Sequence, residues 1–177
     1  MATLEKALLG GGCFWCIEAV YNRVKGVEHV LSGYAGGARP NPGYEQVCTG
    51  VSGHAEVIEV TFDTEVISYE EILDIFWAIH DPTTLNAQGA DRGTQYRSVI
   101  YYYNEEQKAK ALASIAQAQK NFEDKIVTEL SSAPLFFKAE AYHQNYYNDH
   151  PTQGYCYAVI APKIEKFMKK FGDKVKK

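Results

Sequence analysis

A pair of cysteines directly follows a run of glycines near the start of the chain, where residues 10–16 read GGGCFWC. The glycines predict a turn between a short buried strand and a helix that begins near Cys13. The first turn of a helix has unpaired N–H groups and a partial positive charge, which favour a thiolate over a thiol. A cysteine so placed can have its pKa lowered from ~8.5 to between ~3.5 and ~7.5. Cys13 is therefore a candidate nucleophile, and the alternative is a small buried hydrophobic residue.

A carboxylate shares one face of a predicted strand with apolar side chains. In residues 54–62, period-two alternation places Glu56 on the same face as Ile58 and Val60. A carboxyl withdrawn from water has its ionised form disfavoured, so its pKa should rise and it could act as an acid near neutral pH. A second possibility stays open: both faces of the strand are partly buried, and Glu56 lies at a wet strand end beside a partner.

Three chemistries are compatible with the cysteine pair. A zinc-stabilised binding module needs four ligands, and neither Cys48, Cys156 nor any histidine completes a familiar spacing. A general dithiol oxidoreductase is compatible with Cys-x-x-Cys at a helix start, although two bulky aromatic residues would crowd a docking protein disulfide. In the third hypothesis, Phe14 and Trp15 form a substrate pocket beside the thiolate. Such a pocket suits a small apolar group next to a polar oxygen.

Composition and charge exclude several classes of partner. The net charge of −4 gives no electrostatic reason to expect nucleic acid. No window approaches the ~18 apolar residues of a membrane span. Residues 1–9 contain charges and only a short apolar run, which does not fit a signal peptide. We therefore expect a cytoplasmic protein with no membrane partner, in which four cysteines are not a structural disulfide framework.

The predicted elements alternate along the chain. Strands are predicted at 6–9, 27–34, 54–62, 98–103 and 126–130. Helices are predicted at 13–24, 68–79, 104–120 and 139–147, and an amphipathic helix near 164–171. The helix at 68–79 begins with a capping box of Ser68 and Glu71. This order predicts one mixed α/β (α+β) domain over residues 1–177, with helices covering a mixed sheet of the split βαβ type. The irregular stretches 35–53 and 82–96 are expected to be functional.

Six spaced motifs together resemble the peptide methionine sulfoxide reductase A family. They are Gly12-Cys13-Phe14-Trp15, Gly33-Tyr34-Ala35-Gly36-Gly37, Asn41-Pro42-x-Tyr44, Gly53-His54-Ala55-Glu56, Asp91-x-Gly93-x-Gln95-Tyr96-Arg97-Ser98 and Tyr142-His143-Gln144. The resemblance implies a single domain with a ferredoxin-like core. It also implies an oxidoreductase that reduces methionine-S-sulfoxide, free or in oxidised proteins, and so repairs them under oxidative stress.

The resemblance further implies a role for each matching residue. Cys13 would be the nucleophile, Glu56 the proton donor to the sulfoxide oxygen, Tyr44 and Tyr96 hydrogen-bond partners of that oxygen, Asp91 an organiser of the polar side, and Phe14 with Trp15 the holders of the methyl group. The chemistry agrees, because a sulfoxide oxygen leaves poorly unless an acid protonates it.

Regeneration needs a second thiol, because Cys13 would be left as a sulfenic acid that condenses to a disulfide. Cys156 resembles the resolving cysteine of the family, on a mobile C-terminal segment of about 150–177, and thioredoxin or another dithiol would reduce the disulfide. Cys16 is the alternative, at a position where many members have glycine. We favour Cys156, because a mobile loop meets disulfide geometry without distorting a helix. Cys48 is expected to be a bystander, the protein a monomer, and no metal or bound cofactor is expected.

Overall fold

A computed structural model describes residues 3–12, 14–37, 54–88, 91–134, 136–139, 144 and 160–172. One sheet contains β1 (Leu4–Gly10), β2 (Val27–Ala35), β3 (Ala55–Asp63), β6 (Val99–Tyr102), β7 (Glu129–Ser132) and β8 (Phe136–Lys138). A separate small pair is formed by β4 (Ala87–Gln88) and β5 (Asp91–Arg92). The helices are α1 (Phe14–Tyr21), α3 (Tyr69–Ile79), α4 (Glu105–Gln119) and α6 (Ala161–Lys170).

The strand order of the sheet is β7-β6-β1-β3-β2-β8. Its inner part, β6-β1-β3-β2, is antiparallel throughout, with α1 joining β1 to β2 and α3 lying between β3 and β6. This is the split βαβ order of a ferredoxin-like core, in which the strand β3 fills the gap between β1 and β2. The expected fold class is confirmed, and β7 (parallel to β6) and β8 (antiparallel to β2) extend it at the two edges.

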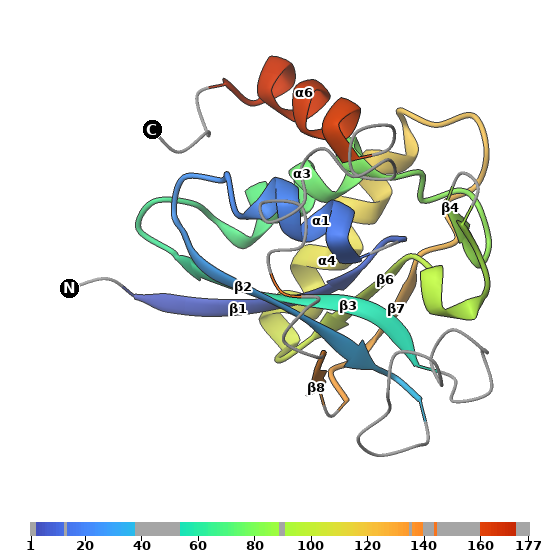
Figure 1. The fold of residues 1–177 in the computed structure, drawn as a ribbon, viewed down its shortest axis with the longest axis horizontal. Coiled ribbons are helices and arrows are strands. Elements are labelled where there is room, and N and C mark those ends of the chain that lie inside the picture. The colour runs from blue at the N-terminus through green and yellow to red at the C-terminus, as the bar shows by residue number, and fades with distance from the viewer. Residues whose placement is uncertain are drawn as a thin grey trace.

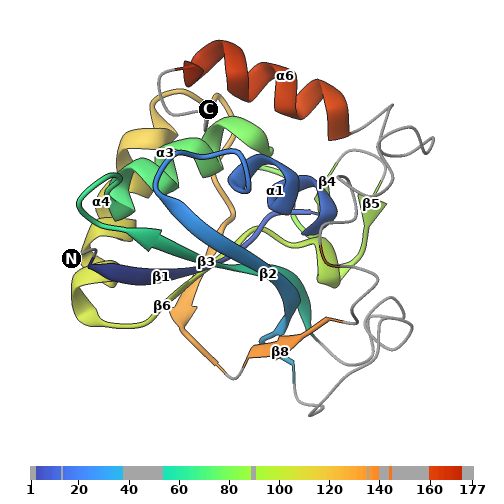
Figure 2. The same cartoon turned by 60° about the vertical axis from the view of Figure 1, so that its left-hand side comes forward.

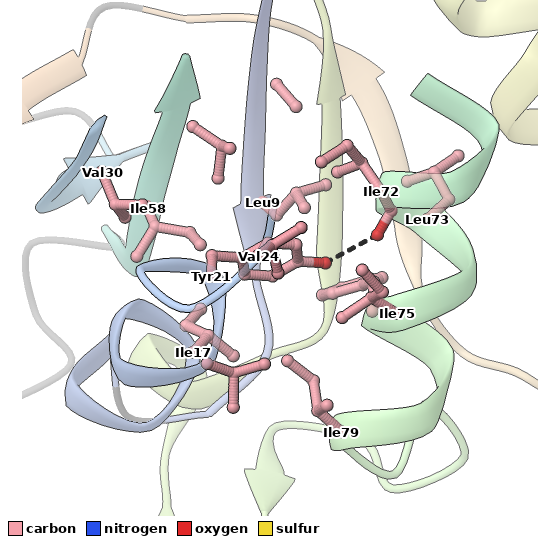
Figure 3. Close-up of a cluster of buried hydrophobic side chains, with 14 of the residues drawn as sticks. Leu9, Ile17, Tyr21, Val24, Val30, Ile58, Ile72, Leu73, Ile75 and Ile79 are labelled. Atoms are coloured by element: carbon pink, nitrogen blue, oxygen red, sulfur yellow. Dashed lines mark hydrogen bonds between the residues drawn. The ribbon is translucent and has the colours of Figure 1, made fainter. Parts of the chain in front are cut away.

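Helices α1, α3 and α6 lie on the same face of the sheet (Figures 1 and 2). Ile58 of β3 contributes to the main core on this side, and the Tyr21 hydroxyl crosses that core to donate a hydrogen bond to the carbonyl of Ile72 at 2.7 Å (Figure 3). Alternate residues of β3, Ala55 and Val57, pack in a second core cluster. Both faces of β3 are therefore buried, so the strand does not show the simple inside–outside alternation of an exposed sheet.

The C-terminal helix α6 docks on the core through one apolar face. Ile164, Phe167 and Phe171 are buried, as their spacing predicts. Lys169 and Lys170 lie in its last turn, where positive charge is favourable. The mobile segment expected at about 150–177 therefore includes a docked helix, and mobility of residues 150–159 stays a prediction.

The structure differs from the expected elements mainly at short strands. β7 begins at Glu129, whereas a strand was predicted over 126–130; the Ile126 N–H is bonded instead by Gln119 Oε1 at 2.8 Å, and the Val127 N–H by the Pro82 carbonyl at 2.8 Å. β4, β5 and β8 have two or three residues each and carry no periodic pattern. The helix predicted at 139–147 lies mostly outside the described residues.

A side-chain amide continues the sheet beyond β8. Gln144 Oε1 accepts the N–H of Ser32 at 2.9 Å, and Gln144 Nε2 donates to the Ser32 carbonyl at 2.9 Å. The Ala139 N–H also donates to that carbonyl. Gln144 thus fixes its own chain position against β2. Within the described part of the chain, no helix has the length and apolar character needed to cross a membrane.

Candidate functional site

The turn predicted before Cys13 is present. β1 ends at Gly10 and α1 begins at Phe14, while Cys13 itself lies outside the described residues. Gly12 has a φ of 91°, and a Cβ there would lie 2.8 Å from Cγ of Gln88, so both backbone and packing require glycine. At Gly11 a Cβ would lie 3.0 Å from the ring of Phe76. The turn is therefore tightly packed against the side chains of Gln88 and Phe76.

Glu56 belongs to β3, and its carboxyl group lies against the first residue of α1. Its side chain is 0% exposed, and Oε1 accepts the backbone N–H of Phe14 at 3.2 Å. The bond joins positions 42 residues apart and brings the carboxyl beside the residue that follows Cys13. The first possibility left open by the sequence, a carboxyl withdrawn from water, agrees with the full burial of Glu56. Both faces of β3 are buried, as the second possibility required, but Glu56 is not at a wet strand end. The helix N-terminus favours its charged form and burial favours its neutral form.

The two aromatic residues after Cys13 differ in exposure. Phe14 is fully buried, and its ring centroid lies 5.7 Å from that of Tyr34 at an interplanar angle of 42°. Trp15 is half-buried and packs against the edge of the main core. Tyr34 also pairs with Glu56 across β2 and β3. Tyr34 therefore supports both Phe14 and Glu56, a role that only its presence in a matching motif could have suggested.

Tyr96 lies on a short 3₁₀ helix, Thr94–Tyr96, that packs against β3. Its N–H donates to the Gly93 carbonyl at 3.0 Å, and its side chain is half-buried against the main core. Asp91 belongs to β5, where its backbone pairs with Gln88, and its side chain lies outside the described part. The structure thus brings the elements that carry Tyr96 and Glu56 together.

Of the four cysteines, Cys16 alone lies among the described residues. Its side chain is 1% exposed and belongs to the main core beneath α1. Cys13, Cys48 and Cys156 lie outside the described residues, as does Tyr44. Their predicted roles stay predictions.

A buried histidine near the turn was not identified from the sequence. His80 Nδ1 lies 2.5 Å from the Phe76 carbonyl, and Nε2 lies 2.8 Å from Oγ of Ser98, which in turn lies 2.7 Å from Oγ1 of Thr128. Burial lowers the pKa of His80 to about 4, so the ring is neutral at neutral pH. Its Cδ2 would lie 3.0 Å from a Cβ at Gly11. His80 is the C-cap of α3, and a lone histidine there has no spacing signal that would reveal its contact with the turn.

The described residues assemble a buried acid at the start of a helix, with aromatic side chains around it. Across the described ranges, no group of three or more His, Cys, Asp or Glu side chains could hold a metal ion. The arrangement can donate a proton from Glu56 to a group held near the residue that precedes Phe14. This geometry suits a thiol nucleophile paired with a general acid.

Comparison with known proteins points to one family. The family model described as peptide methionine sulfoxide reductase matches residues 5–175. A protein of Polynucleobacter asymbioticus named Peptide methionine sulfoxide reductase MsrA is 58% identical over 174 residues, covering 97% of this chain and 91% of the relative. The crystal structure of Mxr1 from Saccharomyces cerevisiae in reduced form has a TM-score of 0.80 at 33% identity, covering 86% of this chain and 89% of that chain. Mxr1 in complex with Trx2 has a TM-score of 0.57 at 24% identity, covering 81% and 84%.

Proposed function

Because the chain belongs to the peptide methionine sulfoxide reductase family, and is an oxidoreductase that reduces methionine sulfoxide, we propose that Cys13 is its nucleophile and Glu56 its general acid. The hydrogen bond from the Phe14 N–H to Glu56 Oε1, 3.2 Å long, carries this proposal. The bond holds the buried carboxyl of Glu56 against the backbone of Phe14, the residue that follows Cys13 in the chain.

The first step transfers one oxygen atom. The Cys13 thiolate attacks the sulfoxide sulfur while a proton from Glu56 neutralises the sulfoxide oxygen. The S–O bond of the substrate and the new bond between the two sulfur atoms then break, the protonated oxygen ends bonded to the Cys13 sulfur, and methionine leaves with the electron pair on its sulfur. Substrate sulfur gains two electrons and Cys13 sulfur loses two, which leaves Cys13 as a sulfenic acid.

Burial favours the protonated form of Glu56, and the hydrogen bond from Phe14 positions its carboxyl near this oxygen. Since the Phe14 N–H occupies Oε1, the transferable proton is carried on Oε2. A carboxyl that is 0% exposed keeps its proton more readily than one in water. The same helix start that bonds Glu56 also favours the thiolate of Cys13. The helix start therefore supports the charged nucleophile, whereas burial supports the neutral acid.

The remaining residues of the site orient the substrate. Tyr44 and Tyr96 hydrogen-bond the sulfoxide oxygen, and Asp91 organises the polar side of the pocket. Trp15, half-buried at the edge of the core, contacts the substrate methyl group, and the buried Phe14 ring packs behind it. Tyr96 is supported by its position on a turn that packs against the strand of Glu56.

Cys156 resolves the sulfenic acid. Its thiol attacks the Cys13 sulfur, water leaves, and a disulfide forms. The burial of Cys16 in the main core supports this choice, because its sulfur would have to leave the core to reach Cys13. Thioredoxin then reduces the disulfide by thiol exchange. The Saccharomyces cerevisiae protein Mxr1 has been crystallised with Trx2, which supports a partner of this kind.

The substrate is the S epimer of methionine sulfoxide, free or within oxidised proteins, and the enzyme works as a monomer in the cytoplasm. Repair of oxidised proteins follows from this substrate. Two electrons enter from the dithiol in each cycle, so the reaction needs no bound cofactor.

Site-directed replacement of Cys13 tests the proposal. Cys13→Ser should abolish reduction of the S epimer, because a hydroxyl is neither ionised nor oxidised under these conditions. The matched control, Cys48→Ser, should keep full turnover. Full activity of the Cys13 variant would contradict the assignment of the nucleophile.

Non-reducing peptide mapping after one turnover tests the resolving step. A disulfide between Cys13 and Cys156 is expected. A link between Cys13 and Cys16 would transfer the resolving role to Cys16. The absence of any link to Cys13 would contradict regeneration through an intramolecular disulfide.

A further inference from the structure

We propose that Gln88 is a positioning residue that sets the backbone at Gly12 and, through it, the orientation of the Cys13 thiol. The inference rests on the proposed function, because it takes Cys13 as the nucleophile. Gln88 does not contact the reacting atoms in this proposal. It acts through the glycine that precedes them.

The amide of Gln88 is committed to the backbone of a neighbouring turn. Gln88 is 6% exposed; its Oε1 accepts the Asp81 N–H at 2.9 Å, and its Nε2 donates to the Asp81 carbonyl. Nε2 also lies 3.3 Å from Oγ1 of Thr84. The turn is itself braced, because Asp81 Oδ1 accepts the Thr83 N–H at 2.9 Å and Thr84 Oγ1 donates to the Ala87 carbonyl at 2.6 Å. Both halves of the amide therefore fix the side chain in place.

The aliphatic part of Gln88 lies against Gly12. A Cβ at Gly12 would lie 2.8 Å from Cγ of Gln88 and 2.9 Å from its Cβ, distances that real Cβ atoms essentially never show. The φ of Gly12 is 91°, a value that other residues rarely adopt. The Gln88 methylenes thus limit where the Gly12 backbone can lie. Because Cys13 is the next residue, a shift at Gly12 passes directly to the thiol.

The residue before Gly12 rests on the same part of the chain. Gly11 packs on the rings of Phe76 and His80, and His80 is held by its bond to Ser98. Two successive glycines are therefore seated on side chains that come from one short stretch, residues 76–88. Contacts at both Gly11 and Gly12 fix the direction in which the backbone enters Cys13 as well as its position.

Gln88 also links the nucleophile turn to a second part of the site. Its backbone pairs with Asp91 across β4 and β5, and this hairpin is closed by a bond from the Gly93 N–H to the Asn86 carbonyl at 2.8 Å. Tyr96 follows on the next turn of the chain. One residue therefore joins the turn of Cys13 to the segment that carries Asp91 and Tyr96.

The consequence is a requirement for Gln88 in the chemical step and not in folding alone. Displacing a reacting group by ~1 Å can lower a rate by ~10²-fold. Gln88→Met retains an unbranched side chain of similar length but removes both amide bonds, so it should release the constraint on Gly12. A matched control exists in Gln107, which is 2% exposed, accepts the Tyr103 N–H at 3.0 Å and donates to the Lys6 carbonyl at 2.7 Å. Lys6 lies near the start of β1, whereas Gly12 follows its end.

The experiment compares Gln88→Met with Gln107→Met by three measurements. These are the melting temperature, kcat and KM for methionine sulfoxide, and the pH dependence of Cys13 alkylation by iodoacetamide, resolved by peptide mass spectrometry. Gln88→Met should lower kcat by about 10- to 100-fold, leave KM close to wild type, and raise the midpoint pH of Cys13 alkylation. Gln107→Met should lower the melting temperature but leave kcat and the alkylation profile unchanged.

Two results would overturn the inference: a wild-type kcat and alkylation profile in Gln88→Met, or equal changes in both variants. If Gln88→Met does not fold, Gln88→Glu retains the methylenes and the acceptor for the Asp81 N–H, and it should show the same changes in weaker form; a wild-type profile there overturns the inference. A separate measurement shows whether the proposed function itself fails. Turnover by Cys13→Ser would contradict the nucleophile, whereas the alkylation profile reports the setting of Cys13 without any turnover.

Discussion

Replacing Glu56 with glutamine should slow the chemical step and leave the fold intact. Glutamine has the same shape as glutamate, and its amide oxygen can accept the Phe14 N–H that Oε1 accepts at 3.2 Å. The substitution therefore removes the transferable proton and little else. The perturbation isolates acid catalysis from the positioning of α1.

The expected loss follows from the role assigned to Glu56. General acid–base catalysis contributes ~10²–10⁴-fold, so the rate of sulfoxide reduction should fall by that factor, equivalent to about 3–5 kcal/mol in activation free energy. The melting temperature should fall by less than about 4 °C, because the bond to Phe14 is retained. Glu56→Leu removes that bond as well. An orphaned buried N–H costs about 1–3 kcal/mol, which lowers the melting temperature of a chain of this size by about 2–12 °C.

The assay is a single turnover with enzyme in excess over methionine-S-sulfoxide and no external reductant, followed by quantification of methionine. Glu18→Gln is the matched control, because Glu18 is 1% exposed, lies on α1 and accepts the Ser32 hydroxyl at 2.9 Å. Its single-turnover rate should equal that of the wild type. A Glu56→Gln rate within about threefold of wild type would refute the general acid assignment, since even the weakest effect expected is ~10²-fold. Equal losses in the Glu56 and Glu18 variants would attribute the effect to the loss of any buried carboxyl and not to proton donation by Glu56.

Two further predictions concern stability. The pKa of His80 is lowered by burial to about 4, against 6.5 for a solvated histidine, so unfolding takes up a proton between these pH values. Its contribution to the free energy of unfolding is present above pH ~6.5 and is lost as the pH falls towards ~4, by up to about 3 kcal/mol. Urea unfolding of His80→Gln should therefore show a weaker loss of stability over this pH range. The same pH dependence in the variant and the wild type would contradict the reasoning. Ser68→Ala removes the reciprocal cap with Glu71 at the start of α3. It should cost about 1 kcal/mol and lower the melting temperature by about 2–4 °C with kcat unchanged, as calorimetry and steady-state assays can check.

The long elements were predictable because their signals are local. The helix expected at 68–79 corresponds to α3, since the Ser68 and Glu71 bonds that start it involve residues three apart. The apolar spacing of Ile164 and Phe167 likewise predicts the buried face of α6. Strand order was predictable at the level of fold class, because alternating strands and helices leave few compact arrangements.

The contacts that seat the turn before Cys13 were not predictable, because they join distant residues through single side chains. The alternation in β3 indicates which residues share a face with Glu56. It does not reveal that Leu8 and Val99 of the neighbouring strands share a second core cluster with Val57 on the other face, which depends on strand pairing. Gln88 lies in a stretch without periodicity, and His80 is the C-cap of α3. Their roles depend on two glycines about 70 residues earlier in the chain, whose close packing no sequence pattern reports.

The outer edge of β2 is closed to a second polypeptide over residues 32–35. β8 pairs with Gly33–Ala35, and the Gln144 amide satisfies both backbone groups of Ser32, where β8 has ended. An open strand edge is a template for pairing with another chain and for aggregation. At Ser32, closure of this edge depends on the Gln144 side-chain amide together with the Ala139 N–H.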